Sequence, residues 1–368
     1  MKNFTCIFPG LYNYILTKDV GMIPYTLSKE YESKIITYDN EEYSYLDTIL
    51  KSENFNIECL EKTDNEKKDV EKYIKTHAKK IDILQLYHLR YNILPSYIFY
   101  YKLYNPSGKI YLKLDANNEF IDFLIKRRGI LPSIRRLYVK ILFKFIDIIS
   151  IETKRNYELL MDSNLVSKDK LLYLPNGIQK TDKNVTNKEP VILYVGYIEK
   201  KNKSIDMLLN AVKDIDLREW KVVLVGEILD DMKEFIDNYF LENPHLKDKV
   251  IFKGYISDKN ILSEEYAKSS IYCCSSRKES FGISTLEAAY HGNYIISTKV
   301  GGSPDILEQT EYGVLIEHDV EKLRKTIKES INNWNSIKQD PVMIQKIVYD
   351  KFNWDYICKK IIEKIEYK

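Results

Sequence analysis

The sequence predicts an α/β protein made of two doubly wound domains, and three observations lead to this prediction. The chain has 368 residues, too many for one ordinary core, and 44% of them are hydrophobic. Short apolar runs alternate with longer segments of helical spacing, as in proteins with parallel sheets. A polar, turn-rich segment, LPNGIQKTDKNVTNKEP, divides this alternation and is predicted to be the interdomain linker.

Five strands are expected in each half of the chain. In the first half they lie near residues 5–9, 34–38, 81–87, 110–114 and 146–151. In the second half they lie near residues 191–195, 221–225, 250–252, 271–274 and 294–297. The last segment, FNWDYICKKIIEKIEYK, carries Trp354, Ile357, Ile361 and Ile365 at helical spacing. We therefore expect domains over 1–178 and 188–345 and a C-terminal crossover helix over 346–368. Ligands of such sheets bind outside the carboxyl ends of the strands, which predicts a site in the cleft between the domains.

Composition argues against several classes of protein. The net charge of +2 does not suggest a nucleic-acid binder, and no apolar run has the length of a membrane span. The first residues lack the basic start and the cleavage site of a signal peptide, so a cytoplasmic location is expected. The five cysteines lack metal or redox spacing. Cys273 and Cys274, in the apolar run IYCC, are expected to be buried in a reducing compartment.

Residues 275–305, SSRKESFGISTLEAAYHGNYIISTKVGGSPD, carry the clearest functional pattern. Glu279 and Glu287 stand eight positions apart, with Phe281-Gly282 between them and a helix-like run behind. The N–H groups at the start of that helix, from Gly282 onward, are free to bind an anion. A diphosphate on these amides, with a carboxylate on each side to accept hydrogen bonds from sugar hydroxyls, predicts a nucleotide-sugar site.

The same residues resemble a known family. Arg277-x-Glu279-x-Phe281-Gly282-x4-Glu287-Ala288 is similar to the E-x7-E signature of family-4 retaining glycosyltransferases. That family has the GT-B fold, two Rossmann-like domains facing a central cleft, with a C-terminal helix that packs back toward the N-terminal domain. LPNGI (174–178), ILYVGYIEKKNKSIDMLLNA (192–211) and FNWD (352–355) resemble further segments of it. The match covers nearly all of 171–368, and over 1–170 it is mostly topological.

The resemblance implies roles for the donor side. The first glutamate of the family touches the transferred sugar and the second the ribose, which here means Glu279 and Glu287. The amides of Phe281, Gly282 and Ile283 would hold the diphosphate or the sugar.

The phosphate clamp departs from the family pattern. Family members usually have Gly-Arg followed by a lysine, whereas this chain has Gly196-Tyr197 and then several lysines. Lys203 aligns best as the remaining cation and Lys201 is the second choice. Lysine supplies charge without the two-pronged geometry of arginine. Arg277 is either a third cation or a structural residue.

Further candidates flank these groups. Tyr255 and Ile256 either meet the base through their backbone or pack a strand end. In the first domain, the resemblance of IDILQLYHLR makes His88 the histidine that faces the reacting sugar, and a structural role is the alternative. Asp115 either binds acceptor hydroxyls or caps a helix. Gly21 either lies near donor and acceptor or simply starts a helix.

Residues 126–155 are strongly basic on an apolar frame, with nine cations against Asp147 and Glu152. They either rest on an anionic membrane surface or form a solvated helix face.

The prediction is a cytoplasmic hexosyltransferase, either free in the cytoplasm or peripheral at the inner face of the membrane. It would move a sugar from a UDP- or GDP-type donor to a hydroxyl of a glycan or lipid-linked acceptor in surface polysaccharide or glycoconjugate synthesis, with retention. Glu279, His88 and Asp115 are the proposed catalytic residues. No tightly bound cofactor and no metal are expected, because fixed cations stabilise the departing diphosphate. The alternatives are a sugar-nucleotide epimerase, a glycan phosphorylase or a non-catalytic nucleotide-binding subunit.

Overall fold

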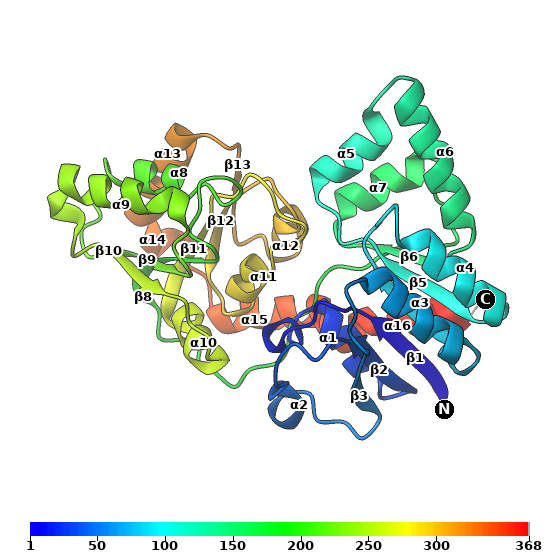
Figure 1. Ribbon diagram of the computed structural model, residues 1–368. Coiled ribbons are helices and arrows are strands. Elements are labelled where there is room, and N and C mark those ends of the chain that lie inside the picture. The colour runs from blue at the N-terminus through cyan, green and yellow to red at the C-terminus, as the bar shows by residue number, and fades with distance from the viewer. Residues whose placement is uncertain (367–368) are drawn as a thin grey trace. The chain divides into compact units, whose positions relative to one another are not determined.

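The protein is described by a computed structural model that covers residues 1–366. Two compact units account for the chain (Figure 1). The first comprises Met1–Gly177 and the chain from Trp354 onward, and the second comprises Ile178–Asn353.

The first unit contains a seven-stranded parallel sheet in the order β3-β2-β1-β4-β5-β6-β7. Its strands are β1 (Lys2–Ile7), β2 (Tyr31–Thr37), β3 (Phe55–Cys59), β4 (Ile83–Tyr87), β5 (Lys109–Lys113), β6 (Ile148–Ile151) and β7 (Leu171–Tyr173). The inner strands β4 and β6 are buried at every position, because helices cover both faces of a parallel sheet.

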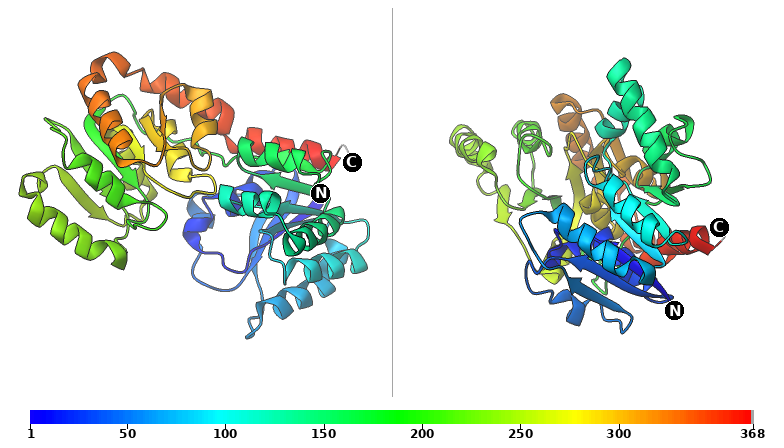
Figure 2. Two further views of the ribbon diagram at one scale, coloured as in Figure 1. Left: turned by 90° about the horizontal axis from the view of Figure 1, so that it is seen from above. Right: turned by 45° about the vertical axis from the view of Figure 1, so that its right-hand side comes forward.

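Helices connect these strands. They are α1 (Asp19–Leu27), α2 (Tyr45–Thr48), α3 (Glu66–His77), α4 (Leu94–Tyr104), α5 (Asn118–Lys126), α6 (Ile130–Lys144), α7 (Lys154–Asp162) and α16 (Trp354–Glu366), with short 3-10 turns η1 (Asn13–Ile15) and η2 (Ala78–Lys80). Helices α5, α6 and α7 lie together as one cluster, as Figure 1 and both views of Figure 2 show.

The second unit contains a six-stranded parallel sheet in the order β10-β9-β8-β11-β12-β13. Its strands are β8 (Glu189–Val195), β9 (Lys221–Val225), β10 (Val250–Gly254), β11 (Ser269–Cys274), β12 (Tyr294–Thr298) and β13 (Gly313–Ile316). Its helices are α8 (Ile205–Val212), α9 (Asp230–Glu242), α10 (Lys259–Lys268), α11 (Ile283–Tyr290), α12 (Ser303–Thr310), α13 (Val320–Asn332), α14 (Trp334–Ile337) and α15 (Pro341–Phe352), with η3 (Pro244–Leu246).

The predicted fold class is confirmed, since both sheets are parallel and doubly wound. All ten expected strands exist, with shifted ends. The sequence prediction missed β3, β7 and β13, and each of these lies at the edge of its sheet. All three missed strands are only partly buried, and β7 and β13 have only three and four residues, so they lack the long buried run that reveals an inner strand.

The C-terminal segment consists of two helices. The expected helix over 346–368 begins inside α15, breaks at Asn353 and continues as α16, and residues 367 and 368 lie outside the described part. Trp354, Ile357, Ile361 and Ile365 are all buried, and α16 packs on α1 in the first unit. A Cβ at Gly177 would lie 2.4 Å from the Trp354 ring, so this glycine permits the contact between the LPNGI and FNWD segments.

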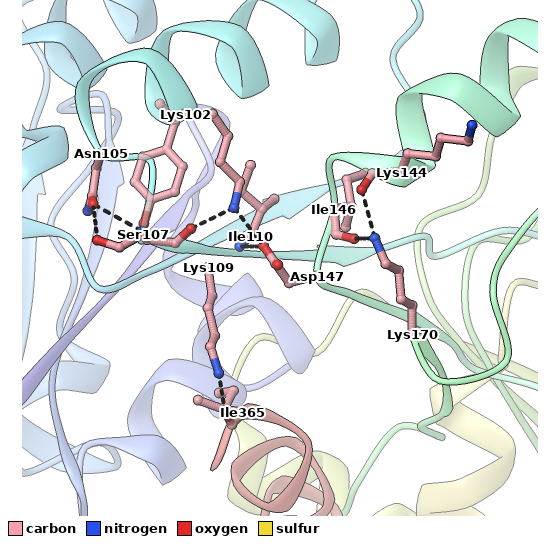
Figure 3. Close-up of polar contacts among 12 residues, drawn as sticks. Lys102, Asn105, Ser107, Lys109, Ile110, Lys144, Ile146, Asp147, Lys170 and Ile365 are labelled. Atoms are coloured by element: carbon pink, nitrogen blue, oxygen red, sulfur yellow. Dashed lines mark hydrogen bonds and ion pairs between the residues drawn. The ribbon is translucent and has the colours of Figure 1, made fainter. Parts of the chain in front are cut away.

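Polar contacts join neighbouring elements of the first unit (Figure 3). Asp147 accepts a hydrogen bond from the N–H of Ile110 (2.8 Å) and pairs with Lys102 (3.0 Å), which ties β5 to α4 and to the start of β6. Lys170 donates to the carbonyls of Lys144 and Ile146, both at 2.7 Å, at the end of α6.

Cysteine burial follows the expectation, since both Cys273 and Cys274 are buried. Over residues 1–366, none of the helices combines the length and the apolar character that crossing a bilayer requires.

Candidate functional site

Glycines shape the carboxyl ends of β8, β9 and β10. Gly196, Gly226 and Gly254 follow or end these strands, with φ of 149°, 150° and 70°. A Cβ on Gly226 would lie 1.8 Å from the carbonyl oxygen of Gly196. Neighbouring loops therefore approach more closely than any side chain would allow, which brings main-chain groups to this edge of the sheet.

The loop between β11 and α11 ends at Gly282, which precedes the first residue of α11. Gly282 has φ 88° and ψ 65°, a left-handed conformation that favours glycine. No side chain caps the helix, and the first N–H groups of a helix have no acceptor one turn earlier. The amides predicted to bind an anion thus lie at an uncapped helix start.

The loop that carries Gly301 and Gly302 packs against the residues before this helix start. Phe281 is buried, its carbonyl accepts a hydrogen bond from the N–H of Gly302 (2.6 Å), and a Cβ on Gly302 would lie 2.3 Å from its ring. A Cβ on Gly301 would lie 2.8 Å from the Cβ of Glu279. The Gly301-Gly302 pair fixes the loop that carries Glu279, a function that sequence analysis did not assign to it.

Glu279 and Lys203 form a direct ion pair. Lys203 Nζ lies 2.7 Å from Glu279 Oε1, and their side chains are only 22% and 13% exposed. Ser276 Oγ donates to the same oxygen at 2.7 Å. An ammonium has three donors, so Lys203 can hold Glu279 and still bind a phosphate.

Arg277 lies against the lysine-rich loop. Its Nε donates to Ser204 Oγ (2.9 Å) and its N–H to the carbonyl of Asn202 (2.7 Å). Lys201, by contrast, is exposed, and Tyr197, at the place of the missing arginine, is 53% exposed. The structure therefore brings Lys203, Arg277 and Glu279 together and leaves Lys201 at the surface.

His318 is a neighbour of this cluster that sequence analysis missed. Its Nε2 lies 3.0 Å from Ser204 Oγ, and burial together with the charge of Arg277 lowers its pKa. A neutral ring can accept the proton of Ser204 while Ser204 accepts from Arg277. His318 lies just beyond β13, an undetected strand, so no sequence signal placed it here.

Glu287, in the second turn of α11, is held by aromatic neighbours. Tyr266 donates to Glu287 Oε2 (3.0 Å), and Lys259 Nζ lies 3.9 Å from Oε1. His291 stacks on Tyr266 with ring centroids 5.5 Å apart, and burial lowers the pKa of His291 to about 4. One carboxylate oxygen of Glu287 is thus fixed while the other faces a cation.

Tyr255 and Ile256 follow the last residue of β10. Tyr255 is 67% exposed, whereas Ile256 packs against the core of the second unit. Packing therefore accounts for the position of Ile256, and the Tyr255 ring extends into solvent.

In the first unit His88 and Asp115 lie together at the carboxyl ends of β4 and β5. His88 Nδ1 is 3.8 Å from Asp115 Oδ2, and both residues have positive φ, 61° and 41°. Such φ values are uncommon outside glycine and recur at functional sites. The alternative that Asp115 caps a helix is wrong, because Asn117 caps α5 by accepting from Phe120 N–H (2.9 Å).

Gly21 lies in the first turn of α1. A Cβ there would be 2.1 Å from the carbonyl oxygen of Leu16, so the glycine permits the close approach of η1 to α1. The contact shows that Gly21 packs closely at the start of α1.

A buried charge cluster lies next to Asp115 and was not foreseen. Lys113 pairs with Glu152 and, at 3.2 Å, with Asp19, and Glu152 also accepts from the Asn176 amide (2.8 Å). All four residues are buried. Burial alone would lower the pKa of Lys113, but the carboxylates of Glu152 and Asp19 raise it above its ordinary value.

A cavity of about 240 Å³ opens beside His88. Apolar residues, Phe8 and Leu94 among them, form most of its wall, and the Arg90–Glu66 ion pair lines one side. Over residues 1–366, no group of three or more His, Cys, Asp or Glu side chains is placed to hold a metal ion.

Sequence and fold comparisons relate the chain to known proteins. Residues 177–346 match the sequence model of the family described as Glycosyl transferases group 1. An uncharacterized 41.2 kDa protein from the cps region of Klebsiella pneumoniae is 24% identical over 274 residues, 71% of this chain and 72% of that protein. N-acetyl-alpha-D-glucosaminyl L-malate synthase of Bacillus anthracis is 30% identical over 139 residues, 38% of this chain and 35% of that enzyme.

Among solved structures, HepE of Anabaena in complex with UDP has a TM-score of 0.72 at 14% identity, with all of both chains covered. At this identity the likeness concerns the fold. The chain spans only about a third of the Bacillus enzyme's length, although it spans most of the Klebsiella protein.

Proposed function

We propose that this chain, whose residues 177–346 match the sequence model of the glycosyl transferases group 1, transfers a hexose from a nucleotide diphosphate donor to an acceptor hydroxyl with retention of configuration. The observation that carries this proposal is the uncapped start of α11 at Gly282, with Glu279 before it and Glu287 after it. An anion-binding helix start between two carboxylates suits a diphosphate that joins a sugar to a ribose.

On the donor side, the amides of Phe281, Gly282 and Ile283 would bind the diphosphate or the sugar, next to the loop that Gly196 begins. Glu279 would accept from hydroxyls of the transferred sugar, and Glu287 would hold the ribose. A UDP-type donor is supported by the presence of UDP in the structure of HepE, and a GDP-type donor is the other candidate. Tyr255 and Ile256 would flank the base.

The chemical task is to stabilise negative charge on the departing diphosphate. Lys203 and Arg277 stand at the loop that leads to the helix start, and Lys201, exposed at the surface, is the second candidate for the lysine of the clamp. Fixed positive charges and helix-terminal amides stabilise such a leaving group without reorganisation, so we expect no metal requirement.

In the first unit, His88 would orient the transferred sugar or bind its developing charge, and Asp115 would bind acceptor hydroxyls. Their positive φ values and the cavity beside His88 support these roles. Gly21 would keep the loop before α1 close to the same strand ends.

We further propose that the acceptor is a glycan or a lipid-linked saccharide of surface polysaccharide or glycoconjugate synthesis. The location of the Klebsiella relative in a cps region supports this pathway. The reaction would take place in the cytoplasm, at the inner membrane face for a lipid-linked acceptor, with residues 126–155 toward anionic lipid.

A second candidate, a nucleotide-binding subunit without catalysis, is favoured by Tyr197 at the position of the family's arginine. The experiment is a thermal-shift screen of UDP-, GDP-, ADP- and CDP-sugars, followed by product analysis with the labelled donor that binds. A ligand that binds only the folded state raises the midpoint temperature. Stabilisation with sugar transfer or slow donor hydrolysis supports the enzyme. Stabilisation without turnover supports the binding subunit, free sugar-nucleotide isomers indicate an epimerase, and no stabilisation by any donor contradicts the proposal.

A further inference from the structure

Helix α6 is apolar on two faces, and only one of them is covered. Val139, Leu142 and Phe143 are buried against the first unit. The other face exposes Ile130, Leu131, Ile134, Leu137, Tyr138, Ile141 and Phe145, each between 39% and 80%. At 100° per residue, these seven side chains fall within about a third of the helix circumference. We call them the α6 apolar face.

This face concentrates the exposed apolar surface of the chain. Over residues 1–366, 20 large hydrophobic residues are exposed, and seven of them lie in the 16 residues from 130 to 145. Single exposed hydrophobic residues are ordinary, whereas a contiguous strip of them marks an interaction surface.

Cations border the strip. Arg128, Lys140 and Lys144 are exposed, and none of them forms an ion pair within the described residues. Lys140 and Lys144 occupy the helix edge next to the apolar face, and the Lys144 side chain extends away from Lys170 in Figure 3. The acidic side chains nearby are already paired, Asp122 with Lys126 and Arg155, and Asp147 with Lys102.

Polar contacts hold α6 in a fixed position at both ends. At its start, Arg136 donates to the carbonyl of Arg127, and the guanidinium groups of Arg127 and Arg135 lie 4.6 and 4.5 Å from the Phe123 ring centroid. At its end, Lys170 donates to the carbonyls of Lys144 and Ile146 (Figure 3). The strip is therefore a feature of a well-anchored helix.

We propose that the α6 apolar face binds an anionic lipid bilayer, lying in its interface with the strip toward the acyl chains and the bordering cations among the headgroups. An apolar strip flanked by lysine and arginine is the pattern of helices that lie in a membrane interface. Charge complementarity favours a lipid surface over a second copy of the chain, which would face the same cations. This inference deepens the membrane partner proposed above and does not depend on the transfer reaction, because vesicle binding needs no donor.

The test is flotation of the full chain with vesicles of phosphatidylglycerol and phosphatidylcholine, compared with phosphatidylcholine alone, at low and high salt. Wild-type protein is expected to float with the anionic vesicles at low salt and to be released at high salt. The triple variant Arg128→Gln, Lys140→Gln, Lys144→Gln should partition about a hundredfold more weakly, because each cation contributes roughly a factor of five near an anionic surface.

A second triple variant, Ile134→Asn, Leu137→Asn, Ile141→Asn, should also lose binding, since it removes the buried apolar area. Two triple variants of the second unit are the matched controls, and both change exposed side chains. The control for the cations is Lys221→Gln, Lys247→Gln, Lys328→Gln. The control for the apolar strip is Leu241→Asn, Ile261→Asn, Met343→Asn. Both controls should bind like wild type.

Three outcomes overturn the proposal: no flotation at low salt, equal binding to neutral vesicles, or strip variants that bind like wild type. A dimer in solution that dissociates in the strip variant would instead assign the face to a second copy. Donor-dependent thermal stabilisation is measured separately, so a failure here leaves the proposed transfer activity intact.

Discussion

The two units position their candidate residues by different physical means. In the second unit, Glu279 and the start of α11 lie on loops whose course is set by glycines, and the key contacts join residues close to those loops, such as Lys203 to Glu279. In the first unit, Asp115 stands beside Lys113, a buried cation shared by Glu152 and Asp19 from distant segments. We infer that the second unit uses its charges for binding and the first unit uses its buried charges for rigidity.

The largest expected effect tests the rigidity that the buried charges give the first unit. Glu152→Ala leaves Lys113 buried without its nearest carboxylate and should lower the free energy of unfolding by about 3–5 kcal/mol. Urea denaturation measures the change. Glu58→Ala, which removes a half-exposed pair with Lys34, should cost less than about 1 kcal/mol. Equal costs for the two variants would show that the buried cluster is not a structural element.

The next effect tests the binding role of the charges in the second unit. Glu279→Gln keeps a hydrogen-bond acceptor for Lys203 but removes the charge, and transfer should fall by about 10²–10³-fold while the unfolding midpoint hardly changes. Initial rates with saturating donor measure it. Glu264→Gln, in a surface pair with Lys183, is the matched control. Full activity in Glu279→Gln would remove this residue from the reaction.

The contrast also explains what sequence could reveal. The two glutamates of the E-x7-E segment and Gly282 between them lie close together along the chain, so their spacing predicted the loop and helix that the structure contains. Lys203 lies 76 positions before Glu279 and was predicted from the resemblance of its own segment to the family. Asp19, Lys113, Glu152 and Asn176 come from four separate segments, and their contacts depend on a strand order that sequence does not specify. His318 was missed for the same reason, since it follows the short edge strand β13.

The pH dependence of the free energy of unfolding tests whether His291 is a structural group of the second unit. Burial lowers the pKa of His291 to about 4, below the ordinary value of 6.5, so between these pH values only the unfolded chain takes up the proton. Stability should therefore fall by up to about 3 kcal/mol as pH drops from 6.5 to 4. Urea titrations at several pH values measure the slope. His291→Phe should flatten it, and His245→Phe, at an exposed position, should not.

The two candidate lysines of the clamp provide a smaller, paired comparison. Lys203→Ala should weaken nucleotide affinity about tenfold, because it removes a partly buried cation beside the anion site, whereas Lys201→Ala changes an exposed side chain and should have little effect. Calorimetric titration with the nucleoside diphosphate measures both. A larger loss in Lys201→Ala would transfer the clamp to that residue.

The smallest effect asks whether an aromatic neighbour, as well as a loop, positions a binding group of the second unit. Tyr266→Phe keeps the buried ring but removes the hydroxyl that donates to Glu287 Oε2, and one such hydrogen bond corresponds to about a fivefold change in affinity. The KM for the donor should rise by that factor while kcat stays nearly constant, because Glu287 is proposed to hold the ribose in both the ground state and the transition state. Tyr239→Phe removes a buried hydroxyl without a partner among the described residues and is the control. An unchanged KM in Tyr266→Phe would mean that the α11 backbone alone orients Glu287, and the second unit would then hold its site entirely through its loops and helix ends.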